Sequence, residues 1–354
     1  MKTYPTNEIK NVVLLGASGS GKTTLAEAMA FDGKVIDRRG SIETDSTLSD
    51  YTDIEHIYKR SIYPTLLFAE YNGYKLNIID TPGADDFCGG LFSAFKVADV
   101  GVMLINAQNG FEVGSEIQAR YARSHDKPII AVINQLDSEK ASWEASLDSI
   151  RAASQVTPVV VQYPVNPGPD FNAFIDVLLM KMYKFKGDTG IREELDIPAE
   201  EMERATELNR ILTEAAAEND EALMELYFEK GVLTQDELRS GLKLGLAKRD
   251  LIPVFCASGK RDIGAKRLME FIINVAPGPL KAPNFVTVDG REIEPDSNGP
   301  TANHRRTPLG RGDLFPGGFG QGDRRYGAGQ LEDGQQREDL ATIRRGRQKP
   351  CKSD

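Results

Sequence analysis

The segment "NVVLLGASGSGKTT", residues 11–24, says most about how this chain folds. It opens with a short, continuous apolar run that ends at a glycine, which predicts a strand buried on both faces. A helical stretch, 22–31, follows at once. Between them, GASGSGKT (16–23) fits the pattern G-x-x-x-x-G-K-[ST], which requires a strand before it and a helix after it. The segment therefore predicts a phosphate-binding loop in an α/β protein.

The chemistry of this loop depends on its glycines and on its last two residues. The backbone N–H groups of Gly19, Gly21 and Lys22 can surround phosphates, because glycine permits close approach and the helix N-terminus adds positive potential. We expect Lys22 to reach the β- and γ-phosphates and the Thr23 hydroxyl to bind Mg²⁺. The alternative is a glycine turn without a ligand. The full predicted loop is Gly16, Ala17, Ser18, Gly19, Ser20, Gly21, Lys22 and Thr23.

Apolar runs alternate with helical stretches along the rest of residues 60–280. Two runs, 64–71 and 74–80, flank Asn72-Gly73, which predicts an antiparallel hairpin. Further buried strands are expected at 98–107, 127–134 and 251–258, with helices at 114–124 and 264–276. This alternation predicts a mainly parallel sheet with helices on both faces and one antiparallel strand. Ligands of such sheets bind at the loops beyond the carboxyl ends of the strands.

Two further motifs follow predicted strands and concern the choice of base. In NQLD (134–137), Asp137 can accept hydrogen bonds from N1–H and the N2 amino group of guanine, a donor pair that adenine lacks. Asn134 would brace the loop, and Gln135 lies beside it. ASGK (257–260) offers Ser258, Gly259 and Lys260 as a loop that reads guanine O6. The alternatives are a capped turn at the first motif and a plain strand-to-helix turn at the second.

The order of four motifs, GASGSGKT, DTPG (80–83), NQLD and ASGK, is that of a GTPase domain. The long segment between NQLD and ASGK, and the run APGP at 276–279, make the chain similar to bacterial elongation factor G from about Asn11 to Thr301. The resemblance implies GTP or GDP with Mg²⁺ as ligands, and the ribosome (rRNA and ribosomal proteins) as partner in tRNA–mRNA translocation. It implies nucleotide contacts from Asp80, Thr81, Pro82 and Gly83, with Asp80 also near the metal ion.

The resemblance also sets the expected domains. Residues 8–280 would form a P-loop GTPase domain of the translation type, with an inserted α+β subdomain at about 155–248. Residues 281–301 would begin a β-barrel and remain incomplete.

Three positions depart from the pattern of elongation factor G. Ala84 stands where the family has the histidine that orients the attacking water, so no catalytic residue is assigned. In RSIYPT (60–65), Tyr63 takes the place of a threonine that binds Mg²⁺, and Thr65 would replace it only through a change of register. Gln135 replaces a lysine. We therefore expect GTP binding with weak hydrolysis, since one preorganised contact of this kind is worth about 10²–10³ in rate. The alternative is that Asp85 or Asp86 positions the water.

Composition fits a globular protein that is not attached to a membrane. The 354 residues carry a net charge of −10, which argues against broad electrostatic binding to nucleic acid. Cys88, Cys256 and Cys351 show no pairing or metal-ligand spacing, which suits a reducing compartment. The polar N-terminus is no signal peptide, and no apolar run is long enough to cross a bilayer. We expect a cytoplasmic monomer.

Residues 302–354 change abruptly in composition. Glycine and arginine dominate, and no helix or strand period is present. An RNA-binding tail and a disordered linker are two interpretations. A third is that this segment is translated out of frame, because both 310–322 and 345–352 can encode sequence like that of elongation factor G when they are read one nucleotide downstream. We favour the frame shift, with a tail that does not fold as written.

Two functions remain open at this stage. The first is a translocation factor of the elongation factor G type that hydrolyses GTP slowly. The second is a GTP-dependent module that binds or protects the ribosome without translocation activity. The insert favours the first. A kinase or ATPase is disfavoured, because Asp137 selects guanine.

Overall fold

The computed structural model describes residues 4–281, 285–286 and 292–293. The chain divides into two compact units, Met1–Pro308 and Leu309–Asp354, and the second unit lies entirely outside the described residues. The expected tail, 302–354, lies outside them as well. Of the expected β-barrel start, 281–301, only two short paired strands are described, β12 (Phe285–Val286) and β13 (Glu292–Ile293).

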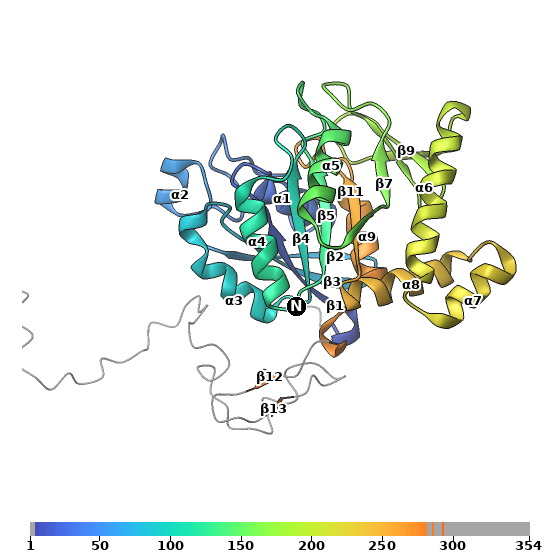
Figure 1. Cartoon of the computed structure of the whole chain (residues 1–354). Helices are drawn as coiled ribbons and strands as arrows, with labels where there is room; N and C mark the ends of the chain where they lie inside the picture. Colours follow the sequence, from blue (N-terminus) through green and yellow to red (C-terminus); the bar gives the residue numbers. More distant parts are fainter. Residues whose placement is uncertain (1–3, 282–284, 287–291, 294–354) are drawn as a thin grey trace, which may run out of the picture. The chain divides into compact units, whose positions relative to one another are not determined.

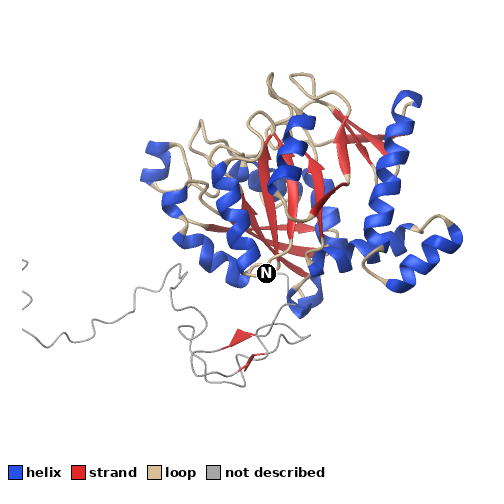
Figure 2. Ribbon diagram, in the orientation of Figure 1, coloured by secondary structure: helices blue, strands red, loops and turns tan. Residues whose placement is uncertain are grey.

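A seven-stranded sheet is the centre of the fold, in the order β2-β3-β1-β4-β5-β11-β6 (Figures 1 and 2). Its strands are β1 (Ile9–Leu15), β2 (Thr65–Tyr71), β3 (Tyr74–Asp80), β4 (Val100–Asn106), β5 (Ile129–Asn134), β6 (Thr157–Val160) and β11 (Leu251–Cys256). Only β2 runs antiparallel to its neighbour. The mainly parallel sheet with one antiparallel strand is thus confirmed, and so is the hairpin at Asn72-Gly73, both of which have positive φ.

Helices cover both faces of this sheet (Figure 1). The helices α3 (Gly89–Val97), α4 (Val113–Ser124) and α5 (Trp143–Ala153) lie on one face. The helices α1 (Lys22–Asp32) and α9 (Ala265–Val275) lie on the other and pack against each other. The strand order explains this division. Connections between parallel strands are right-handed, so helices in connections that run in opposite directions along the sheet lie on opposite faces. The chain changes its direction along the sheet after β3. The central strands β1 and β4 are almost wholly buried, as their continuous apolar runs predict.

The segment between β5 and β11 forms the inserted subdomain. A four-stranded antiparallel sheet contains β7 (Gln162–Pro164), β8 (Ala173–Asp176), β9 (Lys181–Phe185) and β10 (Arg192–Leu195). Three helices follow, α6 (Ala199–Ala217), α7 (Glu221–Lys230) and α8 (Gln235–Lys248). The subdomain is therefore α+β, as expected. Its preceding strand, β6, extends the main sheet beside β11.

A buried ion pair joins the inserted subdomain to the GTPase-like core. Arg267 Nε on α9 donates to Asp176 Oδ2 on β8 over 2.7 Å, and both side chains are nearly inaccessible. Breaking such a pair from one side typically costs about 3–5 kcal/mol, because it leaves an uncompensated buried charge. The pair therefore holds the end of β8, within the insert, against α9.

A second buried cluster, at the end of α1, makes the stability of the fold depend on pH. Asp32 is the last residue of α1, where a negative charge also opposes the helix dipole. Burial, together with repulsion from Asp262, raises the pKa of Asp32 to about 7, although Lys266 lies 3.1 Å away and favours the ionised form. Burial also raises the pKa of Asp262, which Arg39 and Lys266 oppose. This part of the fold is therefore more stable when one carboxyl group is protonated.

We predict that Asp32→Asn stabilises the protein above neutral pH. Because the folded-state pKa of Asp32 lies above its ordinary value of 3.8, the favourable contribution is complete below about pH 4 and is lost as the pH rises through 7. Thermal unfolding at pH 8 should give a melting temperature about 2–4 °C above that of the wild type. At pH 5 the difference in melting temperature between Asp32→Asn and the wild type should shrink or reverse. Asp37→Asn, at an exposed position, is the control, and a lower melting temperature for Asp32→Asn at pH 8 would contradict the prediction.

Candidate functional site

The carboxyl ends of the parallel strands bring the four sequence motifs to one edge of the sheet. Leu14 on β1 lies opposite Asp80 on β3, and Asn106 on β4 lies opposite Asn134 on β5. The loops that follow surround a cavity of about 780 Å³. Of the predicted residues, Ser18, Gly19, Gly21, Lys22, Thr23, Gly83, Asn134, Gln135, Asp137 and Lys260 line this cavity.

The loop 16–23 adopts a conformation that requires glycine. Gly16, Gly19 and Gly21 all have positive φ, and Gly21 caps the N-terminus of α1. A Cβ atom on Gly21 would collide with Nδ2 of Asn134, whereas a Cβ atom on Gly19 would meet nothing within 4 Å. Neither position has a side chain over the loop: Gly21 has no room for one, and the space at Gly19 stays open. The loop backbone is therefore accessible from the cavity.

Lys22 is buried at the centre of this loop. Its ammonium group donates to the carbonyl oxygens of Gly16 (2.8 Å) and Ala17 (3.0 Å). Burial lowers the pKa of Lys22 to about 8, while the carboxylates of Asp80 and Asp50 favour the charged form. An anion in the cavity would therefore stabilise the protonated lysine, which suits a phosphate ligand.

The end of β3 places a carboxylate against the start of α1. The Thr23 hydroxyl donates to Oδ2 of Asp80 over 2.7 Å and lies 3.1 Å from Oγ of Ser61. Burial raises the pKa of Asp80, and Thr23 is the first of the hydrogen-bond donors that oppose the shift. The second oxygen, Oδ1, is buried and has no hydrogen bond of standard geometry in the described part of the chain, although the Ser49 hydroxyl lies close enough to favour the ionised form. A buried carboxylate oxygen beside a hydroxyl is a suitable environment for a divalent cation.

The residues after Asp80 pack against the phosphate-binding loop. The Thr81 hydroxyl donates to the Leu14 carbonyl oxygen (2.5 Å) and is buried. Gln118 on α4 accepts from the Gly16 N–H (2.7 Å) and donates to the Pro82 carbonyl oxygen (3.4 Å), so one side chain ties both loops together. Sequence patterns give no sign of Gln118, because it lies 102 residues away from Gly16.

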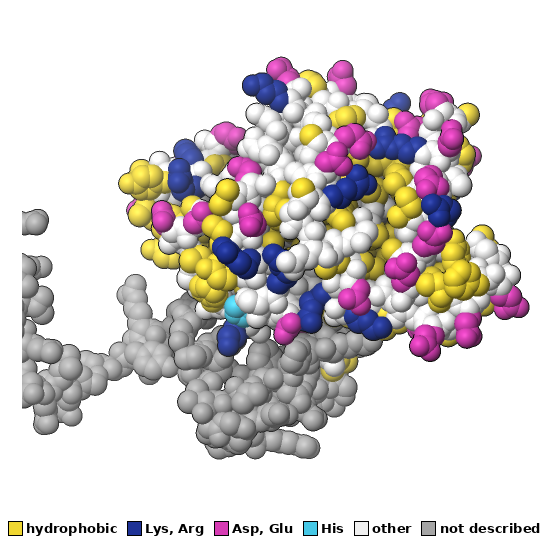
Figure 3. Space-filling model, viewed as in Figure 1, with side chains coloured by type: hydrophobic (Ala, Val, Ile, Leu, Met, Phe, Trp, Pro, Cys, Tyr) yellow, Lys and Arg dark blue, Asp and Glu magenta, His cyan; other side chains and the backbone are white. Residues whose placement is uncertain are grey.

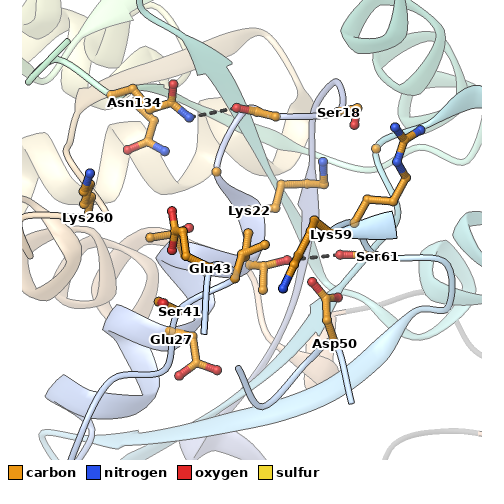
Figure 4. Close-up of a pocket in the computed structure, with 18 of the residues that line it drawn as sticks. Ser18, Lys22, Glu27, Ser41, Glu43, Asp50, Lys59, Ser61, Asn134 and Lys260 are labelled. Atoms are coloured by element: carbon orange, nitrogen blue, oxygen red, sulfur yellow. Dashed lines mark hydrogen bonds between the residues drawn. The ribbon is translucent and has the colours of Figure 1, made fainter. Parts of the chain in front are cut away.

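Asn134, Gln135 and Asp137 of NQLD and Lys260 of ASGK line another part of the cavity, and Figure 4 shows Asn134 and Lys260 on the side away from Asp50. Asn134 donates from Nδ2 to the Ser20 carbonyl oxygen (2.8 Å) and accepts from the Gly259 N–H (3.0 Å). Ser258 donates to Oδ1 of Asp137 over 2.7 Å. The motifs are therefore joined to one another, and one oxygen of Asp137 is held while its side chain lines the cavity.

Gln135 has a defined place in this network. It has positive φ, donates from Nε2 to the Gly19 carbonyl oxygen (2.8 Å) and accepts from Nδ2 of Asn106 (2.9 Å). Its side chain thus spans from the NQLD loop to the phosphate-binding loop along the cavity wall.

Ala84 lines a second cavity, of about 480 Å³, on the other side of Gly83. Asp85 and Glu112 also line it, whereas Asp86 does not. Two histidines lie in the described part of the chain, and both are engaged elsewhere: His56 Nε2 contacts the Asp50 carbonyl oxygen, and His125 stacks on Phe95. No imidazole among the described residues therefore occupies the space beside Ala84, and Asp85 is the aspartate that lies next to it.

A segment without any sequence motif closes the remaining side of the cavity. Glu27 on α1 accepts from the backbone N–H groups of Gly40 (2.9 Å) and Leu48, which holds this segment against the helix. Thr65 is not among the lining residues, since its hydroxyl donates to the Ser49 carbonyl oxygen (3.0 Å). Ser61 is the hydroxyl that approaches Thr23. The lining residues of this segment are Arg39, Gly40, Ser41, Ile42, Glu43, Asp50, Tyr58, Lys59, Arg60 and Ser61.

Fold and site together define a guanine-nucleotide-binding GTPase domain of the translation-factor class. Comparison with protein families agrees: residues 7–278 match the elongation factor Tu GTP binding domain, and the chain belongs to this family. Proteins of the family bind guanine nucleotide, usually with Mg²⁺, and hydrolyse GTP. In the described part of the chain, no helix has both the length and the apolar character needed to cross a bilayer.

One solved structure shows how the chain compares with a longer protein. The crystal structure of ttk003000868 from Thermus thermophilus superimposes with a TM-score of 0.73 at 30% sequence identity. The match covers 78% of this chain and 41% of that one. The present chain thus spans well under half the length of this relative.

We predict that Asn134→Ala weakens the binding of GDP. The substitution removes two buried hydrogen bonds, to Ser20 and from Gly259, each worth about 1 kcal/mol or more. The dissociation constant of GDP, measured by calorimetry, should rise about 30- to 150-fold. Asn109→Ala, at an exposed position outside the cavity, is the control and should leave it unchanged. An effect of Asn134→Ala below threefold would contradict the role given to this residue.

Proposed function

We propose that the cavity binds GTP and GDP with the base against Asp137 and the phosphates against the loop 16–23. The observation that carries this proposal is the joint fixation of Asn134, Asp137 and Ser258, which leaves a preorganised carboxylate lining the cavity. Guanine would donate two hydrogen bonds to this carboxylate. Adenine has no such donor pair and would leave the second oxygen of Asp137 without a partner, which is costly.

The residues near Lys22 fit a nucleotide-bound Mg²⁺ ion. Thr23 offers a hydroxyl oxygen, and Asp80 offers a buried oxygen that has no hydrogen bond of standard geometry with the described residues. Among the described residues, no group of three or more His, Cys, Asp or Glu side chains could hold a metal ion by itself. This agrees with Mg²⁺, which is commonly bound by one or two carboxylates together with substrate phosphates. Thr23 and Asp80 would hold the ion there, and the bound ion would neutralise charge on the phosphates.

We further propose that this domain hydrolyses GTP slowly. The position beside Gly83 has the methyl group of Ala84, which neither orients water nor carries a proton, and the adjoining cavity is lined by the carboxylates of Asp85 and Glu112. Negative charge beside the γ-phosphate repels the charge that the phosphate already carries and gives no help in neutralising it. The competing possibility, that Asp85 positions the water, is supported by its place in this cavity.

At the level of the whole protein, we propose a factor of the elongation factor G type that acts on the ribosome in tRNA–mRNA translocation. The inserted α+β subdomain between NQLD and ASGK supports this proposal. Its helix α7 has no buried residue and exposes Phe228 (79%), with Val232 (68%) just beyond it. Figure 3 shows apolar side chains gathered in the region of α7, with acidic side chains around them. This apolar surface beside acidic side chains suits contact with a basic protein better than contact with RNA. The alternative remains a GTP-dependent module that binds or protects the ribosome without translocating.

The expected domain boundaries are also proposals. The GTPase domain would span 8–280 with its insert at about 155–248, residues 281–301 would begin a β-barrel, and 302–354 would be a tail read out of frame. The nucleotide sequence of codons 302–354 tests the last point. If codons 310–322 cannot encode a strand when they are read one nucleotide downstream, the frame-shift proposal is wrong.

We predict that Ala84→His accelerates GTP cleavage about 10²–10³-fold in single-turnover experiments on 70S ribosomes, because it adds one preorganised contact to the attacking water. Ala84→Leu is the matched control: it fills the same cavity without an imidazole and should not accelerate the reaction. If the wild-type protein already cleaves GTP as fast as a factor that has the histidine, the proposal of slow hydrolysis is wrong.

We predict that the in-frame, full-length protein moves tRNA and mRNA by one codon in a fluorescence translocation assay when GTP is present. Forward movement would support the elongation factor G type. Ribosome binding that depends on GTP, with no movement at saturating protein, would favour the binding or protection module instead.

A further inference from the structure

The backbone of residues 47–50 is fixed at the wall of the nucleotide cavity. The Thr65 hydroxyl donates to the Ser49 carbonyl oxygen (3.0 Å), and the His56 ring lies 2.8 Å from the Asp50 carbonyl oxygen. The Asp50 N–H donates to Oγ1 of Thr47 (3.3 Å). Thr65, which does not reach the cavity, therefore serves to hold the residue that precedes Asp50.

The side chain of Asp50 points into the cavity toward Ser61 (Figure 4). The residue is only 4% exposed, and neither carboxylate oxygen has a hydrogen bond of standard geometry with the described residues. A buried ionised carboxylate is expensive, so such groups usually have a cation or several donors beside them. The Ser61 hydroxyl favours the ionised form, yet burial still raises the pKa of Asp50 to about 6.

The side chains of Lys22, Lys59 and His56 are engaged with other atoms. Lys22 donates to the carbonyl oxygens of its own loop, and Lys59 pairs with Asp45 over 2.5 Å. The His56 ring contacts the backbone of Asp50 rather than its carboxylate. The neighbouring carboxylate, Asp80, also has an oxygen without a hydrogen bond of standard geometry, and the two acids repel each other. Two carboxylates and the hydroxyls of Thr23 and Ser61 thus gather in one region of the cavity.

We propose that Asp50 supplies an oxygen ligand to the Mg²⁺ ion that is bound with GTP at Thr23 and Asp80. This inference rests on the nucleotide binding proposed above. The carboxylate would take the place of the threonine ligand for which this chain has Tyr63, whose side chain is 54% exposed. Mg²⁺ accepts carboxylate oxygens readily, and its charge would offset the repulsion between the two acids.

This arrangement has a consequence that a neutral threonine would not have. A second carboxylate near the phosphates strengthens binding when the cation is present, but it repels the nucleotide when the cation is absent. Nucleotide affinity should therefore depend unusually strongly on Mg²⁺. Removal of the charge at position 50 should lower the affinity when Mg²⁺ is present and raise it when Mg²⁺ is absent.

The test is the affinity for a fluorescent, non-hydrolysable GTP analogue, mant-GMPPNP, measured with 5 mM Mg²⁺ and with EDTA in the wild type and in Asp50→Asn. Asp50→Asn preserves the shape of the side chain, and the contacts that fix this segment involve the backbone of Asp50. Asp53→Asn makes the same charge change three residues away at an exposed position outside the cavity, and it is the matched control. Circular dichroism confirms folding of each variant.

We expect the Mg²⁺ concentration at half-saturation of binding to rise about 10- to 100-fold in Asp50→Asn. In EDTA, the same variant should bind the analogue at least about threefold more tightly than the wild type. Asp53→Asn should resemble the wild type in both conditions. The inference is overturned if Asp50→Asn weakens binding of the analogue equally with and without Mg²⁺, or if it changes the half-saturating Mg²⁺ concentration by less than twofold. Asp50 would then have a purely structural role. If the wild type binds no analogue in either condition, the proposed nucleotide site itself fails.

Discussion

The pairing of β1 with β3 is the constraint on which the rest of this structure depends. Because the strands are parallel and Leu14 lies opposite Asp80, the loop 16–23 and the loop after Asp80 leave the sheet at the same edge. The 2.7 Å hydrogen bond from Thr23 to Asp80 and the contacts of Thr81 and Gln118 then join the two loops. A shift of either strand by one residue would separate Thr23 from the carboxylate and point Asp80 to the other face of the sheet.

The two sides of the cavity differ in how closely they follow the pattern of related GTPases. On the base side, Asn134, Asp137 and Ser258 form one connected network. On the phosphate side, Ala84 leaves a cavity, and Thr65 fixes backbone instead of facing the metal region. Asp50 lies where an oxygen ligand is lacking. This difference is coherent with a protein in which holding the nucleotide and its cation matters more than rapid cleavage.

The sequence was sufficient for the features that local patterns encode. The glycines of 16–23 need positive φ, Asn72-Gly73 specifies a two-residue turn, and continuous apolar runs specify buried strands, so each prediction had a physical basis within a few residues. The segment 39–61 could not be predicted in this way. Arg39 and Gln118 acquire their places through contacts with residues far along the chain, and no periodicity marks them. The orphaned state of Asp50 is visible only once the fold surrounds it.

The most direct test of the central claim is a competition between GDP and ADP for the purified protein in the presence of Mg²⁺. A carboxylate at Asp137 that is held in place by Ser258 should favour GDP by about 10³-fold or more, because adenine offers no donor pair and leaves the second carboxylate oxygen without a partner. Equal affinity for the two nucleotides would contradict the assignment of the cavity as a guanine-nucleotide site.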